Sequence, residues 1–200
     1  MKVLYVIGLP GCGKTTMVET ALEITCMAPT PVLDGPVPHV RYDDWLWVIG
    51  KPRDDFGGTD TLSMGIQPKA IEWIANLPLN IDYAEPVTGY APTAVPDVLL
   101  GEGDRLANRG FFATCPNLTI IYLDTPIWLA RQRMADRAEA LGRKPQNESW
   151  WKGRVTKVDN LIGGLPHLRF DGRLPPYALG ADLADLIVMA KSPATRKPFR

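Results

Sequence analysis

Short apolar runs alternate along the chain with segments in which apolar residues recur at helical spacing. Lys2–Ile7 and Leu118–Leu123 are nearly continuous apolar runs rich in β-branched residues, typical of strands buried on both faces. Further strands are predicted at His39–Tyr42, Asp97–Gly101 and Leu168–Phe170. Helices are predicted over Lys14 to about Cys26, Gln67–Leu77, Leu106–Phe112, Pro126–Leu141, Trp150–Leu161 and Ala178–Ala190. This alternation predicts an α/β fold with three layers, a mostly parallel sheet covered by helices on both faces.

Composition adds few constraints. The 200 residues suit a single domain over 1–190, followed by a basic C-terminal tail over 191–200. The 22 basic and 22 acidic residues cancel, so no global field favours a polyanion, although a local basic patch is compatible with this balance. No apolar run is long enough to span a membrane, and the three cysteines form no metal-ligand pattern. We therefore expect a cytoplasmic protein with no membrane partner; no feature indicates an oligomeric state.

The most specific motif lies between the first strand and the first helix. Gly8–Thr15 (GLPGCGKT) matches G-x-x-x-x-G-K-[ST] at every fixed position. The glycines let backbone N–H groups turn inward around a polyphosphate, and the following helix directs its positive end at the same charge. Lys14 is expected to reach the β- and γ-phosphates of ATP, and the Thr15 hydroxyl to ligate Mg²⁺. The residues expected to contact the nucleotide are Gly8, Leu9, Pro10, Gly11, Cys12, Gly13, Lys14, Thr15 and Thr16.

Cys12 lies inside this loop. Its simplest role is that of a small residue that fits. Because a thiolate beside a helix N-terminus can have a lowered pKa, the sequence also predicts sensitivity of Cys12 to alkylation.

The rest of the chain favours a kinase among P-loop NTPase-type folds. No N-K-x-D element for reading guanine is present. Asp43 follows the predicted strand His39–Tyr42 and, in a parallel sheet, would face the same crevice as the phosphate loop, where it could act as general base. Its neighbour Asp44 suits a helix cap. The alternative for both is a solvated acidic turn.

An arginine-bearing lid is predicted at about 131–157. Arg131, Arg133 and Arg137 lie on the predicted helix Pro126–Leu141, and Arg133 and Arg137 share a face. Their guanidinium groups could neutralise the charge that develops on a transferred phosphoryl group. The alternative is a solvated helix face paired with acidic neighbours.

These elements together resemble the P-loop kinases related to the phage-type polynucleotide 5′-hydroxyl kinase. In that family a G-x-P-G-x-G-K-[ST] loop is followed by a strand ending in an Asp-Asp pair, and a later strand ends in D-x-P, with arginines nine and thirteen residues beyond its Asp. The sequence Tyr42–Trp45 (YDDW) and the segment Asp124–Pro126 (DTP), with Arg133 and Arg137, are similar to these elements. The resemblance covers Met1 to about Leu161. It implies that Asp43 is the general base and that Arg137 and Arg133 contact phosphates.

Two segments depart from that family pattern. The glycine- and hydroxyl-rich stretch Arg53–Met64 has no counterpart, and its Arg53 is a candidate anchor for substrate phosphate. The segment Gly101–Arg105 (GEGDR) offers Glu102 or Asp104 to hold Mg²⁺ through water or to orient the acceptor, and Arg105 to bind a substrate phosphate. Turn and cap roles are equally compatible with these acidic residues.

The acceptor hydroxyl is predicted to belong to nucleic acid. From Arg131 to Lys157 there are eight basic and three acidic residues, interleaved with Trp150 and Trp151, which suits a phosphate backbone and an unstacked base. The basic tail, with Arg196, Lys197 and Arg200, could follow a polyanion. The chain is also similar to phage kinases that phosphorylate 5-hydroxymethyluracil in DNA, which implies a base taken out of the stack.

Two other readings remain open at this stage. A kinase of a deoxynucleoside monophosphate or a small alcohol would use Arg53, Arg105 or Arg131 as its anchor. A P-loop ATPase or regulatory ATP-binding protein would need Lys14 but not Asp43. The segment Phe170–Pro176, after the last predicted strand, corresponds in the resembling kinases to a loop that packs on adenine; the alternative is an ordinary turn.

Overall fold

The computed structural model describes residues 1–25, 29–43, 45–52, 58–77 and 95–191. Within them, a seven-stranded sheet has the order β2-β3-β4-β5-β1-β6-β7. Its strands are β1 (Lys2–Ile7), β2 (Pro29–Val32), β3 (His39–Tyr42), β4 (Leu46–Ile49), β5 (Val98–Glu102), β6 (Leu118–Asp124) and β7 (His167–Asp171). The strand β1 lies between β5 and β6 and is parallel to both. The phosphate loop therefore emerges from the middle of the sheet.

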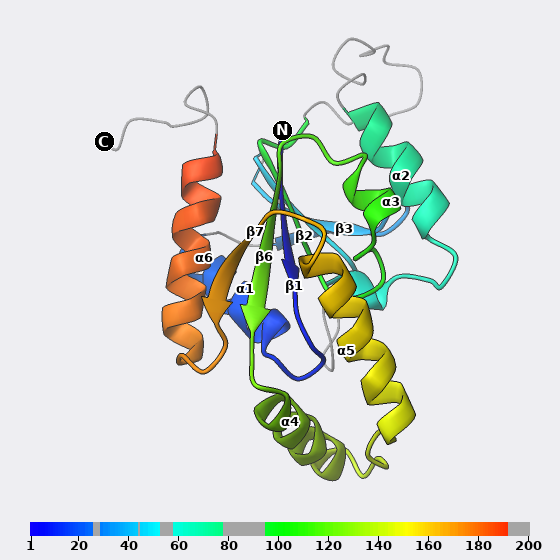
Figure 1. Cartoon of the computed structure of the whole chain (residues 1–200). Helices are drawn as coiled ribbons and strands as arrows, with labels where there is room; N and C mark the ends of the chain where they lie inside the picture. Colours follow the sequence, from blue (N-terminus) through cyan, green and yellow to red (C-terminus); the bar gives the residue numbers. More distant parts are fainter. Residues whose placement is uncertain (26–28, 44, 53–57, 78–94, 192–200) are drawn as a thin grey trace.

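Helices cover both faces of this sheet (Figure 1). The helices α1 (Lys14–Thr25) and α6 (Pro176–Ala190) pack against each other on one face. The helices α2 (Gln67–Asn76), α3 (Arg109–Phe112) and α5 (Glu148–Ile162) cover the other face, and α4 (Ile127–Ala140) lies beyond the edge at which β1 and β6 end. A 3₁₀ turn, η1 (Gly58–Thr61), follows β4. The predicted three-layer α/β fold is confirmed.

The alternation of side chains along β1 explains the two-sided core. Val3, Tyr5 and Ile7 belong to the cluster beneath α2, α3 and α5, whereas Leu4 and Val6 belong to the cluster beneath α1 and α6. Successive side chains of a strand point to opposite faces, so both faces of this strand require apolar residues. The continuous apolar run in the sequence is the result.

One part of the sheet differs from the sequence expectation. The strands β4, β5, β1, β6 and β7 are parallel, but β3 is antiparallel to both β4 and β2. The sequence pattern missed β2, which lies in a proline-rich stretch, and β4, a four-residue apolar run. The strand ending at Tyr42 is therefore the second strand of an antiparallel meander and not a parallel strand of the central sheet.

An aromatic stack joins this meander to α2. The His39 ring stacks on Trp47, with ring centroids 4.6 Å apart, and lies 5.4 Å from the ring of Trp73. Its Nδ1 is 2.9 Å from the carbonyl oxygen of Val37, and Arg41 Nε donates to its Nε2. Burial of the imidazole and the nearby Arg41 charge lower the pKa of His39, while the Val37 carbonyl opposes the shift.

This lowered pKa predicts a loss of stability in mild acid. The unfolded chain binds the His39 proton near pH 6.5, above the folded pKa, so the stabilisation is present above that pH and is lost as the pH falls below it. Urea unfolding at pH 7.5 and 5.5 should show a smaller free energy of unfolding at the lower pH. His39→Phe, which keeps a ring in the stack, should reduce this difference. The assignment of this pH dependence to His39 would be contradicted if His39→Phe kept the full difference in unfolding free energy between the two pH values. It would also be contradicted if the control variant His167→Gln lost that difference.

Candidate active site

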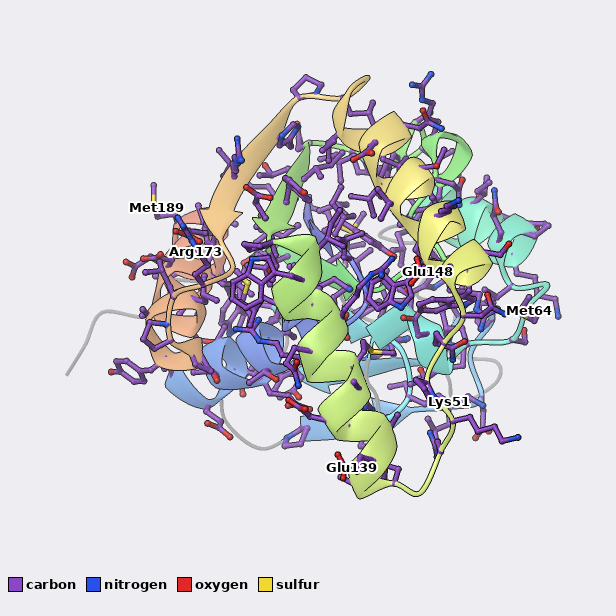
Figure 2. The ribbon with its side chains drawn as sticks, turned by 60° about the horizontal axis from the view of Figure 1, so that its bottom comes forward. Lys51, Met64, Glu139, Glu148, Arg173 and Met189 are labelled. Carbon is purple, nitrogen blue, oxygen red and sulfur yellow. The ribbon has the colours of Figure 1, made fainter. Side chains whose placement is uncertain are left out.

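Three parallel strands bring the main candidate groups to one edge of the sheet. The phosphate loop follows β1, Gly50 and Lys51 follow β4, and Glu102 is the last residue of β5. In open α/β sheets, ligands bind at the edge where the parallel strands have their carboxyl ends. The helix α4 borders the same edge and lies in front in Figure 2.

Glycine is required where the phosphate loop meets α4. Gly11 has φ +78°, and a Cβ atom there would lie 2.4 Å from the backbone oxygen of Ala130. Gly13 has φ +100° and lies under the guanidinium of Arg133. These left-handed conformations turn the loop around a central space, and the first N–H groups of α1 have no acceptor within the helix. The loop therefore fits a bound polyphosphate.

Lys14 lies across the mouth of the loop. Its Nζ donates to the carbonyl oxygens of Gly8 and Leu9, each at 3.1 Å. Burial alone would lower the pKa of Lys14, but the acidic groups Cys12, Glu102 and Asp60 raise it above its usual value. The ammonium is thus kept charged at the place where phosphate oxygens would bind.

The environment of Cys12 contradicts the predicted lowering of its pKa. The side chain is fully buried, and burial raises the pKa of the thiol although Lys14 opposes the shift. A buried neutral thiol is a poor nucleophile, so the prediction of alkylation sensitivity is wrong. Cys12 fills space: a Cβ atom on Gly8 would lie 2.8 Å from its sulfur.

Thr15 forms a hydrogen bond with the buried Glu102 carboxylate beside the loop. The Thr15 hydroxyl donates to Glu102 Oε1 at 2.9 Å, and Glu102 is 2% exposed. Burial raises the pKa of Glu102, opposed by Lys14 and by the Thr15 hydrogen bond. Hydroxyl and carboxylate oxygens are suitable ligands for Mg²⁺, directly or through water. Among the described residues no group of three or more His, Cys, Asp or Glu side chains is arranged to hold a metal ion.

The lid arginines approach the loop from α4. Arg133 Nη1 donates to the carbonyl oxygens of Cys12 and Gly172, both at 3.2 Å. This contact joins the loop after β7, the one compared above with an adenine-packing loop, to the phosphate loop. Arg137, one turn further along α4, lines the cavity above Lys14. Arg131 points elsewhere and forms a two-pronged ion pair with Glu148, with both distances 2.7 Å.

Two cavities meet at Thr15 and Glu102. The first, of about 700 Å³, contains the phosphate loop, Arg133 and Arg137, and extends to α5. The second, of about 860 Å³, lies between α1 and β2–β4 and has largely apolar walls. The residues that line the first cavity are Pro10, Gly11, Gly13, Lys14, Thr15, Thr16, Asp60, Met64, Glu102, Asp104, Arg105, Arg133, Met134, Arg137, Trp150, Arg154 and Lys157. This lining combines anion-binding groups with carboxylates.

Carboxylates on the far wall are held by α5 and η1. Asp104 forms ion pairs with Arg154 and with Lys157, the latter at 2.6 Å. Asp60 Oδ1 accepts hydrogen bonds from the backbone N–H groups of Asp104 and Arg105, at 2.9 and 3.1 Å. Sequence reasoning did not single out Asp60. Asp60 follows a glycine pair and the parallel strand β4 in the sequence. This position indicates a residue at the site, but only after Leu46–Ile49 has been assigned as a strand.

Asp43 does not lie at this edge. Tyr42 pairs with Leu46, Leu46 with Val98, and Val98 with Lys2, so Asp43 lies beyond the start of β1. The six residues of β1, at about 3.3 Å each, separate the two edges by roughly 20 Å. The prediction that Asp43 faces the phosphate loop is wrong, because it assumed that His39–Tyr42 is a parallel strand.

Other predicted residues have different outcomes. Glu102 pairs with Thr15, and Asp104 and Arg105 lie in the same cavity. The segment 131–157, predicted as a lid, comprises most of α4 and the first part of α5, and Trp151 of α5 is buried in the core. Arg53, Asp44 and the tail beyond Lys191 lie outside the described residues. In the part of the chain that the structure describes, no helix is both long and apolar enough to cross a bilayer.

Fold and site together define a P-loop kinase, a phosphotransferase with a hydroxyl acceptor. The chain belongs to the P-loop Nucleotide Kinase3 family, whose model matches residues 1–177. This match confirms the predicted kinase class. No curated protein sequence matches the chain.

Solved kinase structures are similar to the chain over most of its length. A sugar kinase from Janibacter sp. HTCC2649 is 15% identical, with 95% of this chain and 96% of that chain covered and a TM-score of 0.47. A gluconokinase from Sinorhizobium meliloti 1021 is 14% identical, with 94% and 96% covered and a TM-score of 0.44. A deoxyadenosine kinase from M. mycoides is 10% identical, with 94% and 99% covered and a TM-score of 0.41.

The contact between Gly11 and α4 gives a direct test of the loop. Gly11→Ala should reduce ATP affinity at least tenfold and destabilise the fold by about 1–3 kcal/mol, because a methyl group strains the left-handed backbone and meets the Ala130 carbonyl. Gly153→Ala is the matched control: its added Cβ meets no atom within 4 Å and lies in α5, where alanine is favoured over glycine by up to about 1 kcal/mol. Calorimetric titration with ATP and thermal unfolding measure both effects. Equal behaviour of the two variants would contradict the role of this contact.

Proposed function

We propose that the protein is an ATP-dependent kinase that transfers the γ-phosphoryl group to a hydroxyl of nucleic acid, with the hydroxymethyl group of 5-hydroxymethyluracil in DNA as the favoured acceptor. The observation that carries the proposal is a single cavity that joins the phosphate loop to a wall of basic and aromatic side chains from α5. Arg154 lies over the Trp150 ring, 5.2 Å from its centroid. A stacking platform beside cations suits a base taken out of the stack together with its phosphate.

The donor side of the site follows from the loop geometry. The backbone of Gly8–Thr15 and the ammonium of Lys14 would hold the β- and γ-phosphates of ATP. Thr15 and Glu102 would hold Mg²⁺, which supplies charge neutralisation for phosphoryl transfer. Arg133 and Arg137 would stabilise the charge that spreads over the transferred group, because both approach the loop from α4.

The acceptor hydroxyl also needs a group that takes its proton. The connection that follows β4 is the natural source, because β4 is the parallel strand that ends beside Glu102. Both ends of this connection are held there: a Cβ atom on Gly50 would lie 2.1 Å from the Gly58 oxygen, and one on Gly58 would lie 2.5 Å from Glu102 Oε1. Lys51 N also donates to Thr61 Oγ1 at 2.6 Å.

The connection runs from Gly50 to Gly58. The segment contains the acidic pair Asp54 and Asp55, which lie outside the described residues. Asp60, directly after it, lines the cavity, and its Oδ1 is oriented by two backbone N–H groups. Asp60 is therefore the described candidate for the general base.

The acceptor is tested with γ-labelled ATP and a panel of hydroxyl compounds. The panel comprises DNA containing 5-hydroxymethyluracil, 5′-hydroxyl oligonucleotides, deoxynucleoside monophosphates and small alcohols, each with wild type and with Lys14→Ala. We expect label in the modified DNA with wild type and none with Lys14→Ala, which loses the phosphate-binding ammonium. Label confined to mononucleotides or alcohols would refute the nucleic-acid acceptor. ATP loss without labelled product would instead indicate an ATPase.

The general base is tested by asparagine substitutions at both edges of the sheet. Asp60→Asn should lower kcat by about 10²–10⁴-fold with ATP affinity retained, because the amide cannot accept the hydroxyl proton. Asp43→Asn, at the opposite edge, is the matched control and should leave kcat nearly unchanged. If Asp54→Asn or Asp55→Asn abolishes turnover while Asp60→Asn does not, the base belongs to the same connection but is not Asp60. If only Asp43→Asn loses turnover, the general base does not lie at the edge of the sheet that carries the phosphate loop, and the proposal is refuted.

A further inference from the structure

A third cavity lies between α4 and α5 and continues the catalytic cavity. It has a volume of about 580 Å³, within the roughly 300–1,000 Å³ of small-molecule sites. Its residues are Asp60, Arg105, Arg131, Met134, Ala135, Arg137, Ala138, Leu141, Arg143, Lys144, Pro145, Gln146, Trp150 and Trp151. Five of these, Asp60, Arg105, Met134, Arg137 and Trp150, also line the cavity that contains the phosphate loop. We refer to this third cavity as the α4–α5 groove.

The α4–α5 groove is strongly basic although the chain has no net charge. Its lining contains four arginines and one lysine but a single carboxylate, Asp60. The acidic residues of the two helices do not line it. Asp136 accepts from Gln132, and Glu148 neutralises Arg131 through its two-pronged ion pair, so the other lining cations are Arg105, Arg137, Arg143 and Lys144. In Figure 2, Glu139 is seen at the end of α4 and Glu148 at the start of α5. The groove therefore presents a local positive potential beside the catalytic cavity.

Two arginines of the groove have incomplete hydrogen bonding. Among the described residues, the buried side-chain nitrogen and oxygen atoms that lack a hydrogen-bond partner are Nε of Arg105 and Nε of Arg131. Buried polar groups in native proteins are nearly always paired, and exceptions call for an explanation. Both arginines line the groove, so an anion bound there could draw their guanidinium groups into new hydrogen bonds.

Aromatic rings lie between the two cavities. Trp150 lines both, and Trp151, which is buried, lines the groove with the Arg131 guanidinium 5.3 Å from its ring centroid. Arg154 lies over Trp150. Trp150, which is partly exposed, is the ring that a base of a single strand could stack on, while the neighbouring cations follow the backbone.

We propose that the α4–α5 groove binds the nucleotide next to the acceptor in a single-stranded DNA substrate, with its phosphate held by Arg143 and Lys144. The inference rests on the proposed function and deepens it, because it makes the acceptor a polymer. A small alcohol carries no phosphate for the groove, and a mononucleotide carries only the phosphate that belongs to the acceptor nucleotide itself. A strand places one phosphate after each sugar, and so requires a second anion site beside the first.

The test compares acceptor lengths. Single-stranded DNA of one, three and nine nucleotides, each with one 5-hydroxymethyluracil, is offered to wild type and to Arg143→Glu/Lys144→Glu. In wild type, kcat/KM should rise about 10–100-fold from the shortest to the longest acceptor, because the longer strand gains contacts to one or two phosphates. The change should lie chiefly in KM. The double variant should lose most of this rise, and its salt dependence should be shallower by about 0.7 per lost phosphate contact.

The matched control carries the same change of charge at distant exposed sites. Lys2→Glu/Lys69→Glu alters the exposed end of β1 and the exposed face of α2, and should keep the dependence on length. Lys144→Glu alone changes one exposed side chain and should reduce the dependence in the same direction if the double variant does not fold.

The outcomes separate the two proposals. If wild type labels DNA equally well at every length, or if the groove variants keep the full dependence, the groove inference is overturned and the proposed function stands. If no DNA acceptor is labelled at any length, the proposed function itself fails.

Discussion

The hydrogen bond between Thr15 and the buried Glu102 carboxylate determines how the two sides of the site are arranged. Glu102 ends β5 and accepts from the first turn of α1, so the donor loop is held against the strand that carries the far wall of the cavity. The same carboxylate packs against Gly58, where any side chain would collide with it. A single buried carboxylate thus positions the phosphate loop, the beginning of η1 and the segment that carries Asp104. Leaving it unpaired at this depth would be costly, which explains the close packing around it.

The central part of the architecture could be predicted because its signals are local. The strand β1, the phosphate loop and α1 are consecutive in the sequence, and the residue pattern of each predicts one kind of structure. The meander could not be predicted in the same way, because four-residue strands give little periodicity. One clue was available: His39–Tyr42 and Leu46–Ile49 are separated by three residues, whereas a parallel crossover needs about a dozen. The positive φ of Asp43, +52°, belongs to that tight turn.

The helix α5 shows why a composition argument gave only part of the site. Its basic residues and tryptophans suggested contacts with nucleic acid, but the helix is amphipathic. Trp151, Val158 and Leu161 are buried in the core, while Arg154 and Lys157 lie at the cavity and pair with Asp104. Spacing along the sequence alone could not show which tryptophan faces the site. The charged side of α5 is therefore held in place by the apolar side, and packing beneath the helix contributes to the geometry of the cavity above it.

This arrangement also accounts for a neutral chain that presents a basic site. At physiological ionic strength, exposed charges farther apart than about 8 Å are largely screened from each other. A substrate phosphate therefore responds to the groups that surround it and hardly to the sum over the chain. The lining of the groove between α4 and α5 has four arginines and one lysine against one carboxylate, with Glu148 paired to Arg131 beside it, whereas Asp124 and Asp171 are paired with Arg169 and Arg173 in a separate cavity. In Figure 2, Arg173 and Glu148 lie on opposite sides of α4. Segregation of charge by α4 gives the acceptor side its positive potential without any excess of basic residues.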